Sequence, residues 1–587
     1  MPRPGNRRDS RRGQIIETTS IGPAAAQRLP GKWDAEADVV IVGAGATGLP
    51  AALEAIEAGS SVILIDANWD VGGHGIVSGG NIALGGGTSA QRKYGIEDSP
   101  DLLFADLTDW SVVEANGFPD YRYNDREIIR AFADNSAPTF DWLVAYGVTF
   151  VAESPDNVGA AAAGNSAPRE HHSAPMAWPL IRTGRPVPPE RQATTKGGGS
   201  GVGLMRPLEA AARTRGVNIL LQHRMTGLIR ESASSGRVLG LTATHQGRTL
   251  TIRGAKGVII ATGGSSSNVE FRRMFDPRLT EEYCGVAGEP YSAQDASGEL
   301  AAMAIGAALW GAFNQTGEFG SGIVKPGRIG CQYGYANMAL EPTSPLFPLA
   351  RATGLAVQDY QDLILVNQAG RRFYDETQGV FTANSHNAVK DYVPGSYRNA
   401  ANVKYRPSNF LNAALAGTGE PVNGGGPIWA IFDSDAVSRE NWGVAPPHVD
   451  RAAGFFFSGA TIAELAENIV NKYQRKPLPA DVLQATVERY NVHVDAGQDP
   501  DFGKSAPRYK IQTPPFYAAW ATPIVHDTRA GLRINASCQV VDLYGKVIPG
   551  LYCGGESAGG FSMHGLARCI VQGRLAGRNA AAEPTGD

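Results

Sequence analysis

A glycine-rich turn between an apolar strand and a helix constrains this chain more than any other feature. Residues 39–42 form a short β-branched run, the pattern of a buried parallel strand. The sequence Gly43-x-Gly45-x-x-Gly48 follows directly, and residues 49–58 are rich in Ala and Leu, which predicts a helix. Together these pieces predict the first half of a βαβ unit.

The second strand of this unit is residues 61–65, and it ends at Asp66. In a dinucleotide fingerprint the first glycine permits a tight turn, the second lets the backbone approach a pyrophosphate, and the third lets helix and strand pack closely. The helix N-terminus favours the phosphates. An acid about twenty residues further on accepts hydrogen bonds from a ribose 2′-OH. Asp66 has this spacing, so we predict a dinucleotide site.

The composition excludes several classes of function. The 587 residues suffice for two or more domains, and a net charge of −4 with mixed signs gives no footprint for nucleic acid. Five cysteines without close pairing or metal-like spacing argue against a disulfide framework and a metal site, and favour a reducing, cytoplasmic setting. No apolar run reaches the length of a membrane span, so we expect no membrane contact. Residues 1–35 are polar and predict a flexible N-terminal arm.

A second glycine-rich stretch covers residues 72–88. So many glycines disfavour a regular helix or strand, and a loop laid against a bulky planar ligand explains them. His74 lies inside it and either contacts that ligand or is an ordinary hydrogen-bonded loop histidine, with the second interpretation slightly favoured. Residues 197–203 precede a predicted helix at 205–213, and they fit an approach to phosphate or substrate as well as a flexible lid.

The rest of the chain divides into segments of different character. Residues 336–515 hold more Pro, Asn and Tyr, and we interpret them as an inserted cap domain. Residues 36–335 and 516–587 share the style of the first βαβ unit and are interpreted as the two parts of one domain. Further predicted elements are two helices within 99–150, a meander of strands at 217–221, 238–244 and 249–252, a strand at 257–261, a helix at 295–308, a cap strand at 363–367, cap helices at 461–473 and 480–490, and a strand, turn and helix from residue 550.

Three separated motifs resemble those of one family. They are the fingerprint with Asp66, the middle Ala261-Thr-Gly-Gly264, and the C-terminal Gly550-Leu-Tyr-Cys-Gly-Gly-Glu556. Together they resemble the FAD flavoproteins of the fumarate reductase/succinate dehydrogenase group, which includes 3-ketosteroid Δ1-dehydrogenases. The resemblance implies an α/β fold: a Rossmann-like FAD-binding domain of the glutathione reductase type, split in sequence, with an inserted α+β cap. It also implies one FAD, a small-molecule substrate and a separate electron acceptor or donor, and it leaves the oligomeric state open.

The same resemblance implies which residues bind the cofactor. Glu556 would hold the ribityl chain, and the C-terminal turn would lie near the pyrimidine end of the flavin. The expected FAD contacts are Gly43, Gly45, Ala46, Thr47, Gly48, Asp66, Ala67, Gly73, His74, Ser78, Gly79, Gly80, Asn81, Met225, Ala261, Thr262, Gly263, Asp295, Gly555, Glu556, Arg568 and Ile570.

The substrate motifs depart from the fumarate reductase pattern. His564-Gly-Leu-Ala-Arg568 is similar to a stretch whose arginine clamps a substrate carboxylate, so Arg568 is expected either at the substrate or in a structural ion pair. Gln378 occupies the place of the proton-donating arginine, and it can supply neither that proton nor a positive charge. The expected His-Pro-Thr segment is also missing, so we predict that fumarate is a poor substrate.

Tyr517 is the first candidate for proton transfer. It lies in Pro515-Phe-Tyr-Ala518, which resembles the stretch that carries the general base of ketosteroid dehydrogenases. The alternative is an aromatic residue at a domain hinge. His526 and Arg529 are candidates for holding a substrate oxygen. Tyr333, Tyr335 and Asn314 are further candidates for lining the pocket, on their positions in the sequence alone.

These observations predict an FAD-dependent dehydrogenase or ene-reductase that acts on a CH–CH bond beside a carbonyl, as in a cyclic ketone or ketosteroid. Donors to the carbonyl oxygen would stabilise the developing enolate. Three alternatives stay open: a reductase of an unsaturated carboxylic acid, a lyase or hydratase with structural FAD, and a non-catalytic flavin subunit. The chain has no second complete NAD(P)H fingerprint, so electrons are expected to pass to or from a separate partner.

Overall fold

The computed structural model describes most of the chain. The described residues are 29–109, 124–156, 166–176, 200–285, 292–311, 321–324, 326–333, 342–344, 347–377, 411, 413–419, 423–561, 563 and 565–585. Gln378, Tyr335, Asn314 and His564 lie outside them, as does most of the predicted N-terminal arm.

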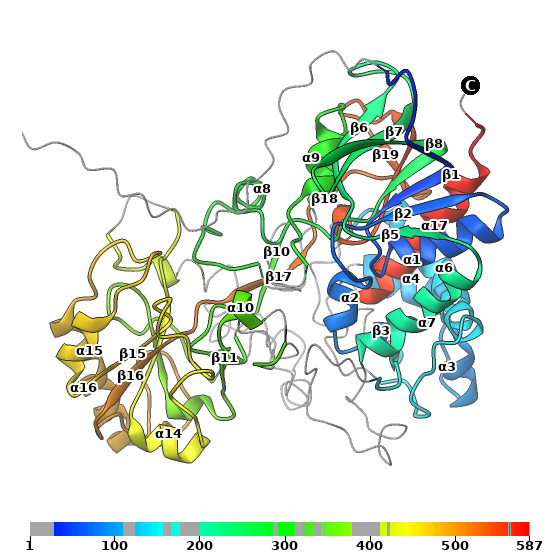
Figure 1. Cartoon of the computed structure of the whole chain (residues 1–587). Helices are drawn as coiled ribbons and strands as arrows, with labels where there is room; N and C mark the ends of the chain where they lie inside the picture. The colour runs from blue at the N-terminus through cyan, green and yellow to red at the C-terminus, as the bar shows by residue number, and fades with distance from the viewer. Residues whose placement is uncertain are drawn as a thin grey trace, which may run out of the picture.

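A mainly parallel sheet forms the larger part of the molecule (Figure 1). Five of its strands run parallel, and they come from both ends of the chain, so the sheet is split in sequence as the fold class predicts. In spatial order the strands are β19 (Gln539–Val541, antiparallel at the edge), β20 (Val547–Cys553), β8 (Arg248–Ile260), β1 (Ala35–Val42), β2 (Val62–Ile65) and β5 (Asn218–Leu220).

Two helices pack directly against each other on this sheet. They are α1 (Gly48–Glu57), which follows the fingerprint, and α17 (Leu566–Ala582), which closes the chain. A Cβ at Gly573 would lie 2.2 Å from the carbonyl oxygen of Thr47, and one at Gly577 would lie 2.2 Å from that of Ala51. These two glycines, one helical turn apart, let the backbones of the two helices touch.

The predicted meander is partly wrong. The antiparallel meander consists of β6 (Arg224–Arg230), β7 (Val238–His245) and β8, whereas the strand predicted at 217–221 is β5 and pairs in parallel with β2. The strands predicted at 249–252 and 257–261 are one continuous strand, β8. Gly254 lies within β8, next to the point where the register with β1 shifts.

The glycine stretch at 72–88 contains regular structure, contrary to expectation. It holds α2 (Gly73–Val77) and β3 (Asn81–Ala83), which pairs with β4 (Glu170–His172). Gly72 and Gly80 have φ values of 107° and 71° and stand at the ends of these short elements, where a left-handed conformation reverses the chain.

The predicted helices are present, with shifted ends. They are α4 (Pro100–Thr108), α6 (Arg126–Ala145), α7 (Gly201–Thr214) and α9 (Ser297–Met303). The cap of α6 is Asp125, whose side chain accepts hydrogen bonds from the backbone N–H groups of Glu127 and Ile128. Shorter elements are α3 (Ser89–Lys93), α8 (Val269–Arg273), α10 (Phe347–Ala350), β9 (Leu309–Trp310) paired with β18 (Gly531–Leu532), β11 (Arg328–Ile329) paired with β12 (Leu355–Ala356), and the 3₁₀ turns η3 (Tyr360–Asp362) and η5 (Gly555–Ser557).

The cap is an antiparallel sheet with helices. Its strand order is β13 (Ile364–Val366), β14 (Trp429–Phe432), β16 (Phe516–Trp520) and β15 (Phe456–Gly459). Alternate residues of each strand enter two separate apolar clusters, one on each face. The helices are α14 (Ser434–Glu440), α15 (Ile462–Asn468), shorter than predicted, and α16 (Ala480–Ala496), longer than predicted.

The two parts are joined by a small two-stranded sheet. It pairs β10 (Ser321–Val324) with β17 (Ile524–Thr528), between the parallel sheet and the cap in Figure 1. Because β16 belongs to the cap sheet, we propose that the chain leaves the cap after residue 520, not at 515. Among the described residues, no helix combines the length and apolar character needed to cross a membrane.

Candidate active site

Four parallel strands end at one edge of the sheet, and each leads into a predicted motif. β1 ends before Gly43, β2 before Asp66, β8 before Ala261 and β20 before Gly554. Backbone bonds join these ends: Gly43 N–H donates to Ile65 (2.8 Å), Ala261 N–H to Val42 (2.8 Å) and Gly554 N–H to Ile260 (3.2 Å). Open α/β sheets bind ligands at this carboxyl edge.

The three fingerprint glycines have different surroundings. A Cβ at Gly43 would lie 2.2 Å from the carbonyl oxygen of Ala261, and one at Gly48 would lie 1.7 Å from that of Gly43. A Cβ at Gly45 would meet no protein atom closer than 3.7 Å, and Gly73 lies beside it. Gly43 and Gly48 are therefore needed for packing, while the position of Gly45 has the room that the predicted approach of a pyrophosphate requires.

Asp66 organises the same turn. Its Oδ2 accepts from Ala44 N–H (2.7 Å) and its Oδ1 from Asn68 N–H (2.8 Å). Burial raises the pKa of Asp66, and these two bonds oppose that rise. Ala46 and Thr47 are buried in the turn, whereas Ala67 is exposed.

The C-terminal turn is tied to the middle motif by a residue that the sequence did not indicate. Gln294 Nε2 donates to the carbonyl oxygen of Gly263 (2.7 Å) and to Oε2 of Glu556 (3.0 Å). The only sequence signal was its place beside Asp295. Gln294 and Ala296 have φ values of 45° and 62°, an uncommon left-handed conformation for residues other than glycine. Such strain is characteristic of functional sites.

The 72–88 stretch carries further predicted FAD contacts, and hydrogen bonds shape its turns. The hydroxyl of Ser78 donates to the carbonyl oxygen of Gly75 (2.7 Å) and accepts from Gly80 N–H (3.2 Å), which shapes the turn containing Gly79. The side-chain oxygen of Asn81 lies 3.2 Å from Nδ1 of His172.

Several of the predicted FAD contacts have buried side chains, and Met225 and Ile570 are the larger apolar ones. Met225 and Ile570 belong to the main apolar core, and Ile570 has no exposed surface. Asp295 is instead partly exposed and pairs with Arg224 at 2.7 Å. Only the backbone of Ile570 is therefore available for a contact with FAD.

Arg568 is buried near the predicted FAD turns, and its guanidinium donates hydrogen bonds to backbone carbonyl oxygens. Its Nη1 donates to the carbonyl oxygen of Phe561 (2.5 Å) and its Nη2 to that of Thr528 (3.1 Å), and the side chain is 2% exposed. These partners are carbonyl oxygens and not the carboxylate of the predicted ion pair, and the predicted contact of Arg568 with substrate stays a prediction.

His526 lies on β17, close to Thr528, and its ring meets that of His74 edge to face at 5.4 Å. The structure thus gathers His526, His74 and Arg568 near the predicted FAD turns. Thr528 also donates from its hydroxyl to the carbonyl oxygen of Glu556 (3.1 Å). Arg529 follows and is 2% exposed.

Tyr517 lies apart from these residues. It is on β16 in the cap, stacked on Phe432 (5.5 Å between ring centroids) and beside Phe456 (5.6 Å). Burial raises the pKa of Tyr517, and Arg451 opposes that rise. Tyr333 is partly buried against the main core, whereas Tyr517 belongs to an apolar cluster of the cap. The two tyrosines are therefore in different clusters.

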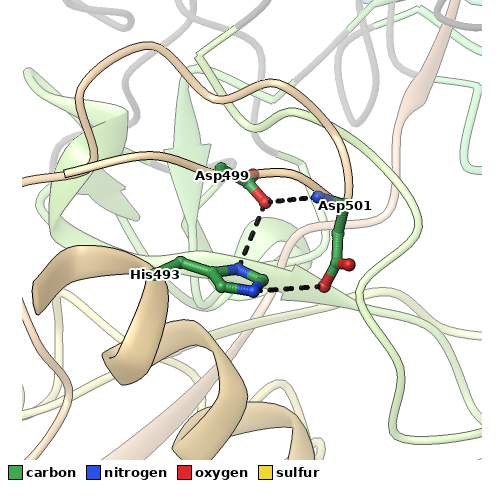
Figure 2. Close-up of side chains that lie close together, drawn as sticks. All are labelled: His493, Asp499 and Asp501. Atoms are coloured by element: carbon green, nitrogen blue, oxygen red, sulfur yellow. Dashed lines mark hydrogen bonds and ion pairs between the residues drawn. The ribbon is translucent and has the colours of Figure 1, made fainter. Parts of the chain in front are cut away.

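A second titratable cluster lies in the cap (Figure 2). His493 Nδ1 is 3.3 Å from Asp499, and its Nε2 is 3.8 Å from Asp501. Asp499 also accepts from Arg372 (3.0 Å), and both oxygens of Asp501 accept from Arg489. Because nearby cations already pair with both carboxylates, the geometry favours an ion-pair network over a metal site.

The chain matches the model of the FAD binding domain family over residues 38–316 and 336–569. It belongs to the FAD binding domain family. Urocanate reductase of Eggerthella lenta is 28% identical over 575 residues, covering 95% of this chain and 77% of that protein. The 3-oxosteroid 1-dehydrogenase of Mycolicibacterium smegmatis is 26% identical, covering 89% and 92%. The resemblance predicted from the three motifs is confirmed.

A solved structure of 3-ketosteroid delta1-dehydrogenase from Sterolibacterium denitrificans matches with a TM-score of 0.61 and 20% identity, covering 93% of this chain and 99% of that one. An open flavocytochrome c3 fumarate reductase matches with a TM-score of 0.60 and 23% identity, covering 94% and 79%. At these identities the likeness shows the fold. FAD is the cofactor of this FAD binding domain protein, which is an oxidoreductase acting on CH–CH bonds.

Proposed function

We propose that the substrate is activated by a neutral carbonyl, as in a ketone or an enone, and that the reaction is α,β-dehydrogenation or its reverse. The observation that supports this most is the position of Arg568. Both of its Nη atoms donate to backbone carbonyl oxygens, which leaves them less able to form a paired clamp on a substrate carboxylate, while its Nε has no hydrogen-bond partner among the described residues. A neutral carbonyl needs hydrogen-bond donors but no such fork.

Different predicted contacts would bind different parts of the FAD molecule. The turn at Gly45 would take the pyrophosphate, Asp66 the adenosine ribose and Glu556 the ribityl chain. When bound, FAD supplies hydride acceptance in the oxidative direction and hydride donation in the reductive one. The tie from Gln294 to Gly263 and Glu556 fixes two of these turns relative to each other.

Proton transfer is assigned to His526. It lies beside His74 and two residues from Thr528, and histidine is the side chain that most often serves as a general acid or base. Tyr517 is less suited to act as a base, because burial raises its pKa and keeps its hydroxyl protonated. It would serve only as a donor, in the reductive direction.

Reduction of an unsaturated carboxylic acid is the second candidate. The similarity to urocanate reductase and to a probable fumarate reductase of Shewanella frigidimarina favours it. Arg529, next to the site and buried, would supply the positive charge in place of Arg568. A separate electron carrier serves either reaction, and the five free cysteines, four of them buried, support the expected reducing compartment.

Anaerobic flavin spectra test the proposal. Oxidised enzyme is mixed with a panel of cyclic ketones and ketosteroids, and reduced enzyme with enones, fumarate and urocanate. Bleaching by a ketone or reoxidation by an enone, faster than with either acid, is the expected result. Faster reoxidation by an acid would favour the second candidate. A flavin that responds to none would indicate a lyase with structural FAD or a non-catalytic subunit.

A further inference from the structure

A fully buried acid lies behind the FAD turns and has no part in the chemistry above. Glu299 is in the first turn of α9 and has no exposed surface. A Cβ at its neighbour Gly298 would lie 2.3 Å from the hydroxyl of Thr262 and 2.4 Å from Ile260, so this turn packs directly on the end of β8. The carboxyl group is therefore held against the middle motif.

Two hydroxyls connect Glu299 to both glycine turns. The hydroxyl of Thr262 is 3.5 Å from Oε2 of Glu299 and 2.9 Å from the hydroxyl of Ser557. Ser557 also accepts from Gly264 N–H (3.2 Å). Thr262 precedes the glycines of the middle motif and Ser557 follows Glu556, so this contact joins the two parts of the split FAD domain.

The surroundings of Glu299 compensate a negative charge only in part, through hydrogen bonds from its own backbone N–H, Ser557 and Thr262. Its other oxygen, Oε1, has no hydrogen-bond partner among the described residues. The titratable groups that act on it are Asp295, before the same helix, and Cys553, at the end of β20, and both are acids. Burial raises the pKa of Glu299 to about 8, against hydrogen bonds from Ser557 and Thr262 that lower it. At neutral pH the group keeps its proton.

We propose that neutral Glu299 is a positioning residue for FAD, because it holds the contact between Thr262 and Ser557 and through it the two glycine turns. Ionisation leaves a buried charge that is only partly compensated at this contact, which drives the turns apart and admits water. FAD release therefore accelerates as the pH rises through the pKa of Glu299. This inference concerns cofactor retention and is independent of which substrate the enzyme takes.

Thermodynamic linkage gives the sign of the change in stability with pH. An acid with a raised pKa in the folded protein favours folding while it is protonated. Relative to an uncharged variant, the wild type loses stability as the pH rises from the ordinary value of 4.5 to about 8. Glu299→Gln is neutral at every pH and keeps the shape of the acid. It should flatten the dependence of FAD release on alkaline pH.

The experiment measures the rate of FAD release from the holoenzyme, by the recovery of flavin fluorescence after dilution, between about pH 6 and pH 9.5. In the wild type, release should accelerate by up to about tenfold per pH unit below the pKa of Glu299 and level off above it, because the ionised fraction of the acid changes in this way. Glu299→Gln should release FAD slowly and at an even rate throughout. Glu270→Gln, which removes an acid whose side chain is 86% exposed, is the control and should follow the wild type.

A second variant keeps the inference testable if Glu299→Gln folds poorly. Ser557→Ala removes one hydroxyl of the contact and should accelerate release at neutral pH while reducing its pH dependence. A flat wild-type profile would overturn the inference, and so would a Glu299→Gln profile that rises like that of the wild type. Loss of FAD at all pH values by a Glu299→Gln protein with native thermal unfolding would also overturn it.

Discussion

The Nη2 of Arg568 donates a hydrogen bond to the carbonyl oxygen of Thr528, 3.1 Å away and forty residues earlier in the chain. This bond connects the closing helix α17 to the strand that carries His526. Arg568 therefore has a structural role that thermal unfolding can measure separately from any role in substrate binding.

Arg568→Lys should destabilise the protein by about 1–3 kcal/mol, because a lysine cannot reach both carbonyl oxygens and leaves one of them buried without a donor. Thermal unfolding of the holoenzyme measures the change. Arg578→Lys, on the same helix with a side chain that is 47% exposed, should have little effect. An unchanged midpoint with a higher KM would show that Arg568 binds substrate instead.

Gly45→Val should abolish FAD retention without unfolding the protein. The new side chain fills the room predicted for the pyrophosphate, and no protein atom lies within 3.7 Å of its Cβ to be displaced. Flavin absorbance after desalting reports retention, and circular dichroism reports folding. Gly31→Val, at an exposed position with nothing within 4 Å, is the matched control and should stay yellow. A yellow Gly45→Val protein would move the pyrophosphate elsewhere.

His526→Gln and Tyr517→Phe should differ in the rate of flavin reduction at saturating substrate. Loss of a general acid or base typically costs 10²–10⁴-fold, and we expect that loss for His526→Gln. Tyr517→Phe keeps the stacking on Phe432 and removes only the hydroxyl, so its rate should stay within a few fold. Stopped-flow absorbance measures both. The reverse order of effects would restore Tyr517 as the proton-transferring residue.

Glu376→Gln should destabilise the cap by about 3–5 kcal/mol near neutral pH, because it removes the carboxylate that pairs with buried Lys504 and one of the two that pair with buried Arg372. Burial alone would raise the pKa of Glu376, but these two cations prevail and lower it to about 2. A lowered pKa contributes stability above the ordinary value of 4.5 and loses it as the pH falls towards 2.

Urea unfolding at several pH values checks this. The difference in the free energy of unfolding between the wild type and Glu376→Gln should be constant above about pH 5 and should become smaller below it. Asp134→Asn breaks a pair with a side chain that is 55% exposed, and it should change stability little at any pH. A difference that persists unchanged at pH 3 would contradict the assigned pKa.

The sequence predicted the parts of the site that depend on local pattern. The fingerprint turn needs only its own strand, glycines and helix, so Gly43, Gly45 and Asp66 could be recognised directly. Gln294 and Glu299 could not, because their partners, Gly263, Glu556 and Ser557, are supplied by other segments of the chain. The motif of Tyr517 predicts a strand but not the sheet that the strand joins, so its place in the cap could not be predicted, and its role in proton transfer stays a prediction.

The continuity of β8 was also beyond local pattern. Local pattern predicts separate strands at 249–252 and 257–261, and pairing with β7 and with β1 keeps the chain between them extended.

The packing of Gly573 and Gly577 against α1 has a consequence for synthesis on the ribosome. The fingerprint is made early, yet its helix is covered by α17, and β8 lacks its neighbour β20 until residues 547–553 have been added. A nascent chain therefore displays an open strand edge, a surface that chaperones bind and that aggregates form on. The turn that carries Gly555 and Glu556, two predicted FAD contacts, is also completed only after these last segments have been translated.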